Sequence, residues 1–230
     1  MRIDFVSLFP AMFSGPMTES IVGRARRAGR VELGLVDPRD FSKDRHGRVD
    51  ARPFGGGAGM ILTPEPLRAA IASVAGRRSR VVYLSPQGRP FDARSAARLA
   101  EFPHLVLVCG HYEGVDSRTA SLFDEEISIG DYIVSGGELP AMVVADAVVR
   151  LIPGVLRKAS AAVEESFSAD LLEHPQYTRP RNWRGKKVPA VLLSGDHAAI
   201  AAWKNRRAAE VTRRKRPDLR RARHSENGVI

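Results

Sequence analysis

The sequence predicts an α/β protein built around a largely parallel β-sheet. Three apolar, strand-like runs begin the segments 80–88, 104–116 and 127–140, and each run ends in a loop that contains glycine. The run in 104–116 is apolar almost without interruption, as expected for a strand that is covered on both faces. Ligands of such sheets bind beyond the carboxyl ends of the strands, so we expect the three loops to converge on one site.

Composition and charge limit the classes of protein to consider. The chain of 230 residues has room for one large domain and a small second one, and 43% hydrophobic residues is ordinary for a globular protein. Cys109 is the single cysteine, so no disulfide framework or cysteine-based zinc site is expected and a reducing cytoplasm is predicted. The N-terminus turns polar at Asp4, and no stretch reaches the roughly 20 apolar residues of a membrane span.

The N-terminal elements follow from local patterns. Residues 3–9 form a predicted strand that ends before a proline, a short helix is expected over 12–27, and the alternating residues 31–36 form a second strand. Residues 37–59 carry many charges and glycines and are expected to be loops. Their GGGAG run lacks a following Gly-Lys-Ser/Thr, so a phosphate-binding loop for nucleoside triphosphates is not supported.

The middle of the chain alternates between helices and strands. Thr63 is expected to cap a helix with its hydroxyl group, with Pro64 at the first helical position. The strand that begins at residue 80 is predicted to turn at the Ser-Pro-Gln-Gly of 85–88, and Asp92 to cap the next helix.

The segment 127–140 joins a β-branched run to a helix over 141–149 that is apolar on all sides except at Asp146. Such a helix is either buried or part of a subunit interface. None of the three loops spells G-x-G-x-x-G, so a Rossmann dinucleotide site is not supported. The residues alone leave open a strand-turn-helix joint that binds no ligand.

The C-terminal part of the chain is strongly basic. Residues 157–170 contain few large apolar side chains and are interpreted as a linker, and 171–230 as a smaller domain whose helix is capped by Asp196. Residues 204–223 hold ten Lys and Arg against two acidic residues, a local net charge of +8. This excess, within a total of +10, favours a nucleic-acid partner over a merely solvated charged face.

Several long motifs, in order, resemble one family. They are YLSPQG (83–88), CGHYEGVD (109–116), SIGDYIVSGGELPA (128–141), RLIPGV (150–155) and PQYTRP (175–180). Together they resemble the bacterial tRNA (guanine-N1)-methyltransferases of the SPOUT superfamily. The resemblance runs from Arg2 to about Leu219.

The resemblance implies a trefoil-knotted, S-adenosylmethionine-binding domain over 1–156, the linker over 157–170 and a helical tRNA-binding domain over 171–230. It implies a homodimer, with each site drawn from both subunits, that methylates guanine N1 at position 37 of tRNA, just 3′ of the anticodon. Two alternatives are a SPOUT enzyme that modifies another RNA base and a non-catalytic RNA-binding protein.

The resemblance also assigns catalytic roles. Guanine N1 carries a proton, so methylation needs a base and a group that stabilises charge on the neighbouring carbonyl oxygen. Arg150 matches the stabilising arginine, and Glu165 stands where the family usually has aspartate before Ser-Phe. Glu164 or Asp170 could serve as the base if the linker register differs.

The remaining site residues fall into two groups. Those expected at the cofactor are Tyr83, Leu84, Ser85, Pro86, Gly110, Tyr112, Glu113, Gly114, Ile129, Gly130, Asp131, Tyr132, Ile133, Val134, Gly136, Gly137 and Glu173. Those expected at the tRNA anticodon arm are Asp50, which would hold the extruded guanine, and Arg206, Arg207, Arg213, Arg214, Lys215 and Arg216. The histidines form no metal-ligand pattern, so no tightly held metal is predicted, and a magnesium requirement is a family expectation only.

Overall fold

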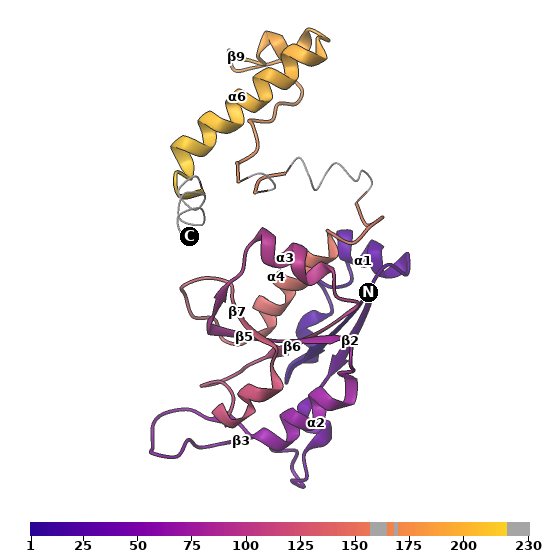
Figure 1. The fold of residues 1–230 in the computed structure, drawn as a ribbon, viewed down its shortest axis with the longest axis vertical. Coiled ribbons are helices and arrows are strands. Elements are labelled where there is room, and N and C mark those ends of the chain that lie inside the picture. Colours follow the sequence, from indigo (N-terminus) through magenta and orange to yellow (C-terminus); the bar gives the residue numbers. More distant parts are fainter. Residues whose placement is uncertain (157–164, 168–169, 220–230) are drawn as a thin grey trace, which may run out of the picture. The chain divides into compact units, whose positions relative to one another are not determined.

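The computed structural model describes residues 1–156, 165–167 and 170–219 (Figure 1). The chain divides into two compact units, Met1–Lys158 and Ala159–Ile230, which we call the N-terminal unit and the C-terminal unit.

The N-terminal unit is organised around a five-stranded sheet in the order β2-β1-β6-β5-β7. Its strands are β1 (Arg2–Val6), β2 (Glu32–Val36), β5 (Ser79–Pro90), β6 (His104–Cys109) and β7 (Glu125–Ser128). All four pairings are parallel, which confirms the predicted α/β class with a central parallel sheet. In the middle strand β6, every residue after His104 is buried, as its apolar sequence predicts.

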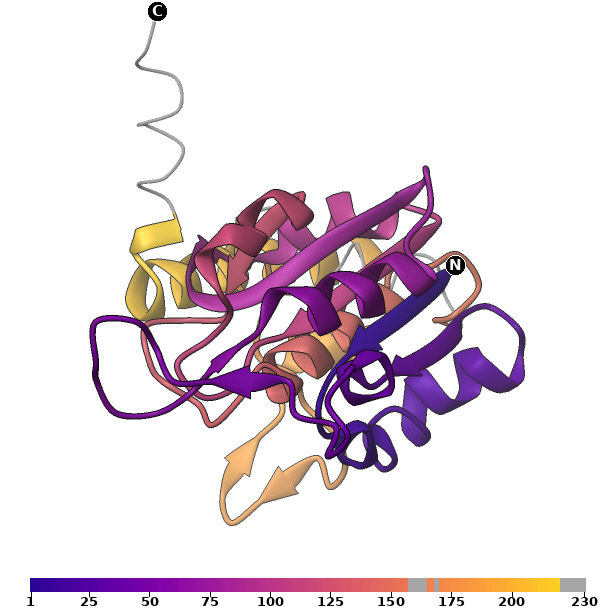
Figure 2. The same cartoon turned by 90° about the horizontal axis from the view of Figure 1, so that it is seen from below.

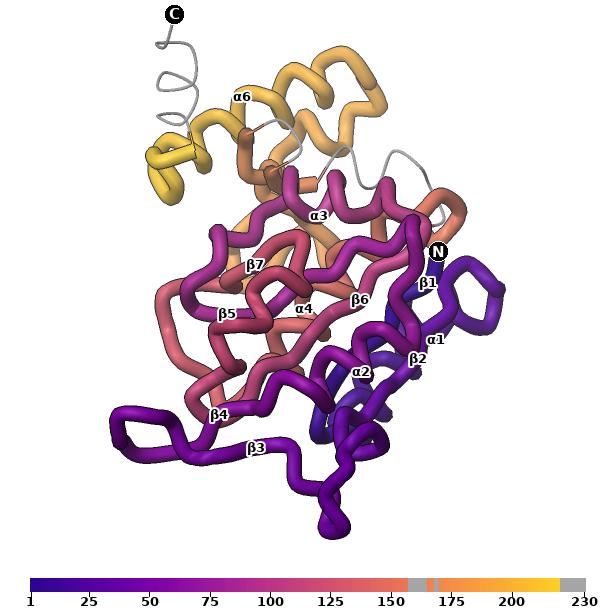
Figure 3. The backbone as a smooth tube through the Cα atoms, turned by 60° about the horizontal axis from the view of Figure 1, so that its bottom comes forward, coloured from indigo at the N-terminus to yellow at the C-terminus, as the bar shows by residue number. Residues whose placement is uncertain are grey.

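Helices cover both faces of this sheet (Figures 1 and 3). One face packs against α1 (Ser20–Arg27), α3 (Ala93–Ala100) and α4 (Glu138–Val149), which share a core cluster with Phe5 and Leu107. The other face packs against α2 (Pro64–Val74), with the 3-10 helices η2 (Pro38–Phe41) and η3 (Ser117–Leu122) beside it. A short antiparallel pair, β3 (Asp50–Ala51) with β4 (Ile61–Leu62), carries a long loop that projects from the unit (Figure 2).

Two predicted elements near the N-terminus are wrong in extent. The first strand ends at Val6 rather than at residue 9, and the 3-10 helix η1 (Pro10–Phe13) follows it. The helix expected over 12–27 is present only as α1, because Gly15 and Pro16 interrupt it and the residue before a proline is disfavoured in the α conformation.

Two further local predictions are corrected by longer-range contacts. The Thr63 hydroxyl does not cap α2; it donates to the carbonyl oxygen of Val49 at 3.0 Å. The segment 85–88 does not end its strand, because β5 continues to Pro90. Leu84 and Arg89 both pair with Ile127, so the intervening residues form a bulge rather than a turn.

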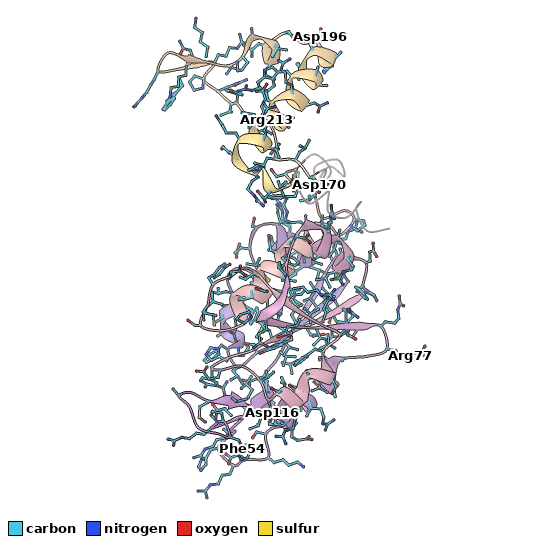
Figure 4. The ribbon with its side chains drawn as sticks, turned by 60° about the vertical axis from the view of Figure 1, so that its left-hand side comes forward. Phe54, Arg77, Asp116, Asp170, Asp196 and Arg213 are labelled. Carbon is cyan, nitrogen blue, oxygen red and sulfur yellow. The ribbon has the colours of Figure 1, made fainter. Side chains whose placement is uncertain are left out.

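The C-terminal unit contains one long helix and a small hairpin. The hairpin consists of β8 (Asn182–Trp183) and β9 (Lys186–Lys187), and the 3-10 helix η4 (Ala190–Leu193) leads to α6 (His197–Lys215). The predicted cap is confirmed, since Asp196 accepts a hydrogen bond from the Ala199 backbone at 3.0 Å. Figure 4 shows Asp196 and Arg213 towards opposite ends of α6. Nowhere in the described ranges does a helix combine the length and the apolar character needed to cross a bilayer.

Candidate functional site

A cavity of about 700 Å³ lies at the carboxyl ends of β5, β6 and β7 in the N-terminal unit. Most of its walls come from three segments, 83–87, 110–117 and 126–137 without Asp131, and Ile61, Ala120, Phe123 and Pro140 complete them. These are the loops that the sequence predicts to converge, and the volume is within the range of about 300 to 1,000 Å³ usual for small-molecule sites.

Most residues predicted for the cofactor line this cavity. They are Tyr83, Leu84, Ser85, Pro86, Gly110, Tyr112, Glu113, Gly114, Ile129, Gly130, Tyr132, Ile133, Val134, Gly136 and Gly137. Asp131 is exposed on the third loop outside the lining, and Glu173 belongs to the C-terminal unit, where it accepts a hydrogen bond from the Gln176 side chain.

Bare backbone holds two of the loops together. The Gly137 amide donates to the Gly110 carbonyl oxygen at 2.7 Å, and His111 forms a β-bridge with Gly136. A Cβ atom on Gly137 would lie 2.7 Å from the Cα atom of Cys109 and 2.8 Å from the Gly110 nitrogen. The loops can therefore approach this closely only because residue 137 has no side chain.

Tyr83 supplies an aromatic wall to the cavity. Its ring stacks on Phe123 with centroids 4.8 Å apart, and Glu126 is its register partner in β7. Burial and the Glu126 carboxylate raise the pKa of Tyr83 to about 12, against a smaller lowering effect of a hydrogen bond with the Val115 backbone. The phenol is therefore neutral at physiological pH.

Three carboxylates line the same cavity. Asp116 accepts hydrogen bonds from the Arg118 side chain at 2.8 and 2.9 Å, which lower the pKa of Asp116 to about 2. Within the part of the chain that the structure describes, Glu113 and Glu126 form no ion pair, so the cavity holds two uncompensated carboxylates. Such a site favours a cationic ligand group. Glu126 was not among the residues predicted for the cavity, because its neighbour Tyr83 lies on another strand.

The β3–β4 ribbon is attached to the second loop. The backbone amide of Glu113 donates a hydrogen bond to the Met60 carbonyl oxygen at 3.0 Å, and the backbone amide of Leu62 donates one to the Gly114 carbonyl oxygen at 3.0 Å. Asp50 pairs with Leu62 in this ribbon, and it does not itself line the cavity. Phe54, at the tip of the ribbon, lies towards the same end of the unit as Asp116 (Figure 4).

The predicted catalytic residues fall in two units, and Arg150, in the N-terminal unit, does not line the cavity. Arg150 follows the last residue of α4, whereas Pro140 lines the cavity near the first turn of that helix. The ten residue steps from Pro140 to Arg150 correspond to about 15 Å along the helix. Glu165 and Asp170 belong to the C-terminal unit, and Glu164 lies outside the described residues.

Some basic residues in and directly after α6 are engaged with acidic side chains, and others are exposed. Arg207 pairs with Glu210, and Arg216 pairs with Asp218 while its guanidinium carbon lies 5.8 Å from the centroid of the Phe167 ring. The remaining predicted tRNA contacts are exposed at Arg206, Arg213, Arg214 and Lys215. Among the described residues, no group of three or more His, Cys, Asp and Glu side chains is arranged to hold a metal ion.

A family model and individual known proteins both match this chain along most of its length. A family model described as tRNA (Guanine-1)-methyltransferase TrmD matches residues 1–222. Proteins named tRNA (guanine-N(1)-)-methyltransferase are similar along nearly their whole length. The Geobacter sulfurreducens protein is 52% identical over 222 residues, 95% of this chain and 91% of its own. The Pelotomaculum thermopropionicum protein is 53% identical over 95% of this chain and 89% of its own. The Chloroflexus aggregans protein is 53% identical over 100% of this chain and 91% of its own.

Proposed function

The chain belongs to the tRNA (guanine-1)-methyltransferase TrmD family, and from this membership we propose that it methylates N1 of the guanosine just 3′ of the anticodon in tRNA. The methyl donor proposed is S-adenosylmethionine. The observation that carries the proposal is the cavity at the three glycine-bearing loops, lined by Glu113 of the second loop and Glu126 of β7, neither of which forms an ion pair within the described residues.

The cavity suits the donor in size and chemistry. Residues Leu84, Ile129, Val134 and Pro140 supply apolar surface for an adenine ring, and the backbone of Gly110 and Gly137 leaves room at its edge. When bound, S-adenosylmethionine supplies a methyl group made electrophilic by its positive sulfonium. Glu113 and Glu126 would stabilise that positive charge.

The chemistry of the chain's own residues is a proton transfer and a charge stabilisation. Glu165 would take the proton from guanine N1 as the methyl group is accepted there. Arg150 would donate hydrogen bonds to the guanine carbonyl oxygen, where negative charge accumulates. Neither role requires a metal bound by protein side chains; a magnesium requirement would act through the RNA or through carboxylates of the chain.

The separation of Arg150 from the cavity supports a site shared by two copies of the chain. Arg150 and Pro140 stand at opposite ends of α4, so the Arg150 of one subunit would serve the cavity of its partner. The exposed face of α4 is apolar at Leu139 and Val143, which are 51% and 48% exposed. An apolar pair four residues apart on a helix suits a subunit interface.

We further propose the domain organisation of the family for this chain. Residues 1–156 would form the trefoil-knotted domain, 157–170 the linker that orders over the guanine, and 171–230 the tRNA-binding domain. Asp50 would hold the extruded guanine, and the exposed residues of α6, with Arg213 and Arg214 among them, would contact phosphates of the anticodon arm. Since the substrate is tRNA, we place the reaction in the cytoplasm.

Incubation with labelled S-adenosylmethionine and a tRNA with guanosine 3′ of its anticodon tests this function. Labelled tRNA is the expected result, and Glu165→Gln should lower turnover strongly while cofactor binding persists. Binding of tRNA without any methyl transfer would favour the non-catalytic alternative. Methylation at a different base would leave a SPOUT enzyme of another specificity.

A further inference from the structure

The β8–β9 hairpin of the C-terminal unit, drawn in light orange in Figure 2, has a basic sequence and carries the exposed Trp183. Asn182 pairs with Lys187 and Trp183 with Lys186, and a two-residue turn joins the strands. Every residue from 178 to 187 is exposed. The hairpin therefore contributes little to the core of its unit.

The first residue of the hairpin turn, Arg184, is an unusual one for its backbone conformation. Arg184 has φ +50° and Gly185 φ +80°, the left-handed conformation that two-residue hairpin turns require and that Asn or Gly usually occupies first. Arginine at this position places its guanidinium carbon 5.2 Å from the centroid of the Trp183 ring. Because this contact lies on an exposed hairpin and adds nothing to the core, the unusual residue points to function rather than to stability.

The exposed indole differs from the other tryptophan of the chain. Trp203 is 9% exposed and has His174 and Tyr177 beside it, so it serves the core of the unit. Trp183 is 56% exposed, and its described ring contact is the cation-π contact with Arg184. Much of its surface is available to a partner.

The charge around this ring has a single sign. The basic residues are Arg179, Arg181, Arg184, Lys186 and Lys187, and no acidic residue occurs between Glu173 and Asp196. Within the described ranges, none of these five side chains forms an ion pair. An aromatic ring among unpaired cations is the combination by which proteins stack on nucleotide bases while neutralising the phosphates around them.

We propose that the hairpin 181–187 is a second RNA-binding element, in which Trp183 stacks on an unpaired base of the tRNA and the flanking cations bind its phosphates. The inference rests on the proposed tRNA substrate and adds a site separate from the basic face of α6. Arg184 holds the indole in place and covers one part of it. Lys187 and Arg181 contact the backbone of the RNA.

Fluorescence of the full-length protein tests the stacking directly. Addition of the tRNA should quench the exposed Trp183, and Trp183→Phe should abolish that change while the emission of Trp203 remains. Trp183→Ala should weaken tRNA binding about tenfold to a hundredfold, and Trp183→Phe should restore most of the affinity. Thermal unfolding of each variant checks that the exposed substitution leaves the unit folded.

The phosphate contacts are tested with matched charge variants. Arg181→Ala with Lys187→Ala should reduce the salt dependence of tRNA binding by about two counterions. Arg77→Ala with Arg78→Ala, in the exposed loop before β5, should leave it unchanged.

Failure of the hairpin inference and failure of the proposed methyltransferase function give different experimental results. The wild-type protein could methylate tRNA while tRNA leaves the Trp183 fluorescence unchanged and Trp183→Ala binds tRNA as tightly as the wild type. The hairpin would then not contact RNA, and the inference would be overturned. If the wild type neither binds nor methylates any tRNA, the proposed function itself fails.

Discussion

The Oε2 atom of Glu138 lies 3.7 Å from the Nδ1 atom of His111, and within the described structure neither buried atom has a hydrogen-bond partner. Glu138 is 1% exposed, and its other carboxylate oxygen accepts a hydrogen bond from the Ser7 hydroxyl at 2.7 Å. Glu138 is the first residue of α4, and its carboxylate thus connects Ser7, just after β1, with His111 of the second cavity loop. A buried acid with one unsatisfied oxygen is costly, so its partners matter to stability.

Substitution of Glu138 tests what this buried side chain contributes. Glu138→Ala removes the bond from Ser7 and leaves a void, so we expect the free energy of unfolding to fall by about 2 to 4 kcal/mol. Glu138→Gln keeps the acceptor and offers an amide donor to His111, so the loss should stay below about 1 kcal/mol. Urea unfolding measures both variants; equal losses would show that the charge, not the hydrogen bonding, holds the site.

Gly137 is predicted to be essential for the shape of the cavity. In Gly137→Ala the new methyl group would meet the backbone of Cys109 and Gly110, so the third loop must move away from the second. We expect binding of S-adenosylmethionine, measured by titration calorimetry, to be lost or weakened more than tenfold. Gly15→Ala is the matched control, because a Cβ atom there meets nothing within 4 Å. Unchanged binding in Gly137→Ala would contradict the assigned cavity.

Glu125 is predicted to steepen acid unfolding. Burial raises the pKa of Glu125, but hydrogen bonds from Arg98 and Arg80 outweigh burial and the net pKa is lowered. A lowered pKa means that the folded state binds fewer protons than the unfolded state, so this stability is present above the ordinary value of 4.5 and is lost as pH falls below it. Glu125→Gln should therefore flatten the loss of unfolding free energy between neutral and acidic pH.

The arginines of α6 should contribute unequally to tRNA binding. Arg216 is engaged with Asp218, whereas Arg213 and Arg214 are exposed without an ion pair in the described ranges. Arg213→Ala with Arg214→Ala should weaken binding and lower the salt slope by about two, and Arg216→Ala should lower it less. Filter binding across a salt series measures the slopes. A larger effect of Arg216 would contradict this ranking and place the main RNA contact at the residue after α6.

Much of the fold could be predicted because its signals are local. The near-continuous apolar run of β6 and the loops at 110–116 and 129–137 indicated a parallel sheet with a site at its carboxyl edge. The helix expected over 12–27 was wrong because Gly15 and Pro16 outweigh the pattern around them. The bulge at 85–88 could not be predicted, since it depends on pairing with the distant strand β7.

The site was less predictable where distant residues meet. No local pattern distinguishes the buried Glu138 from an exposed helix-start glutamate, because its environment is set by Ser7 and His111, both far away in sequence. Glu126 was missed for the same reason, since its neighbour Tyr83 lies on another strand. The separation of Arg150 from the cavity likewise follows from the direction of α4 and not from its composition.

The most direct measurement of the central claim maps the methylated atom. After reaction with S-adenosylmethionine, mass spectrometry of the digested tRNA should find 1-methylguanosine at the nucleotide just 3′ of the anticodon. A matched tRNA with adenosine at that position should remain unmodified. Methylation elsewhere in the first tRNA, or equal methylation of the second, would contradict the proposed reaction.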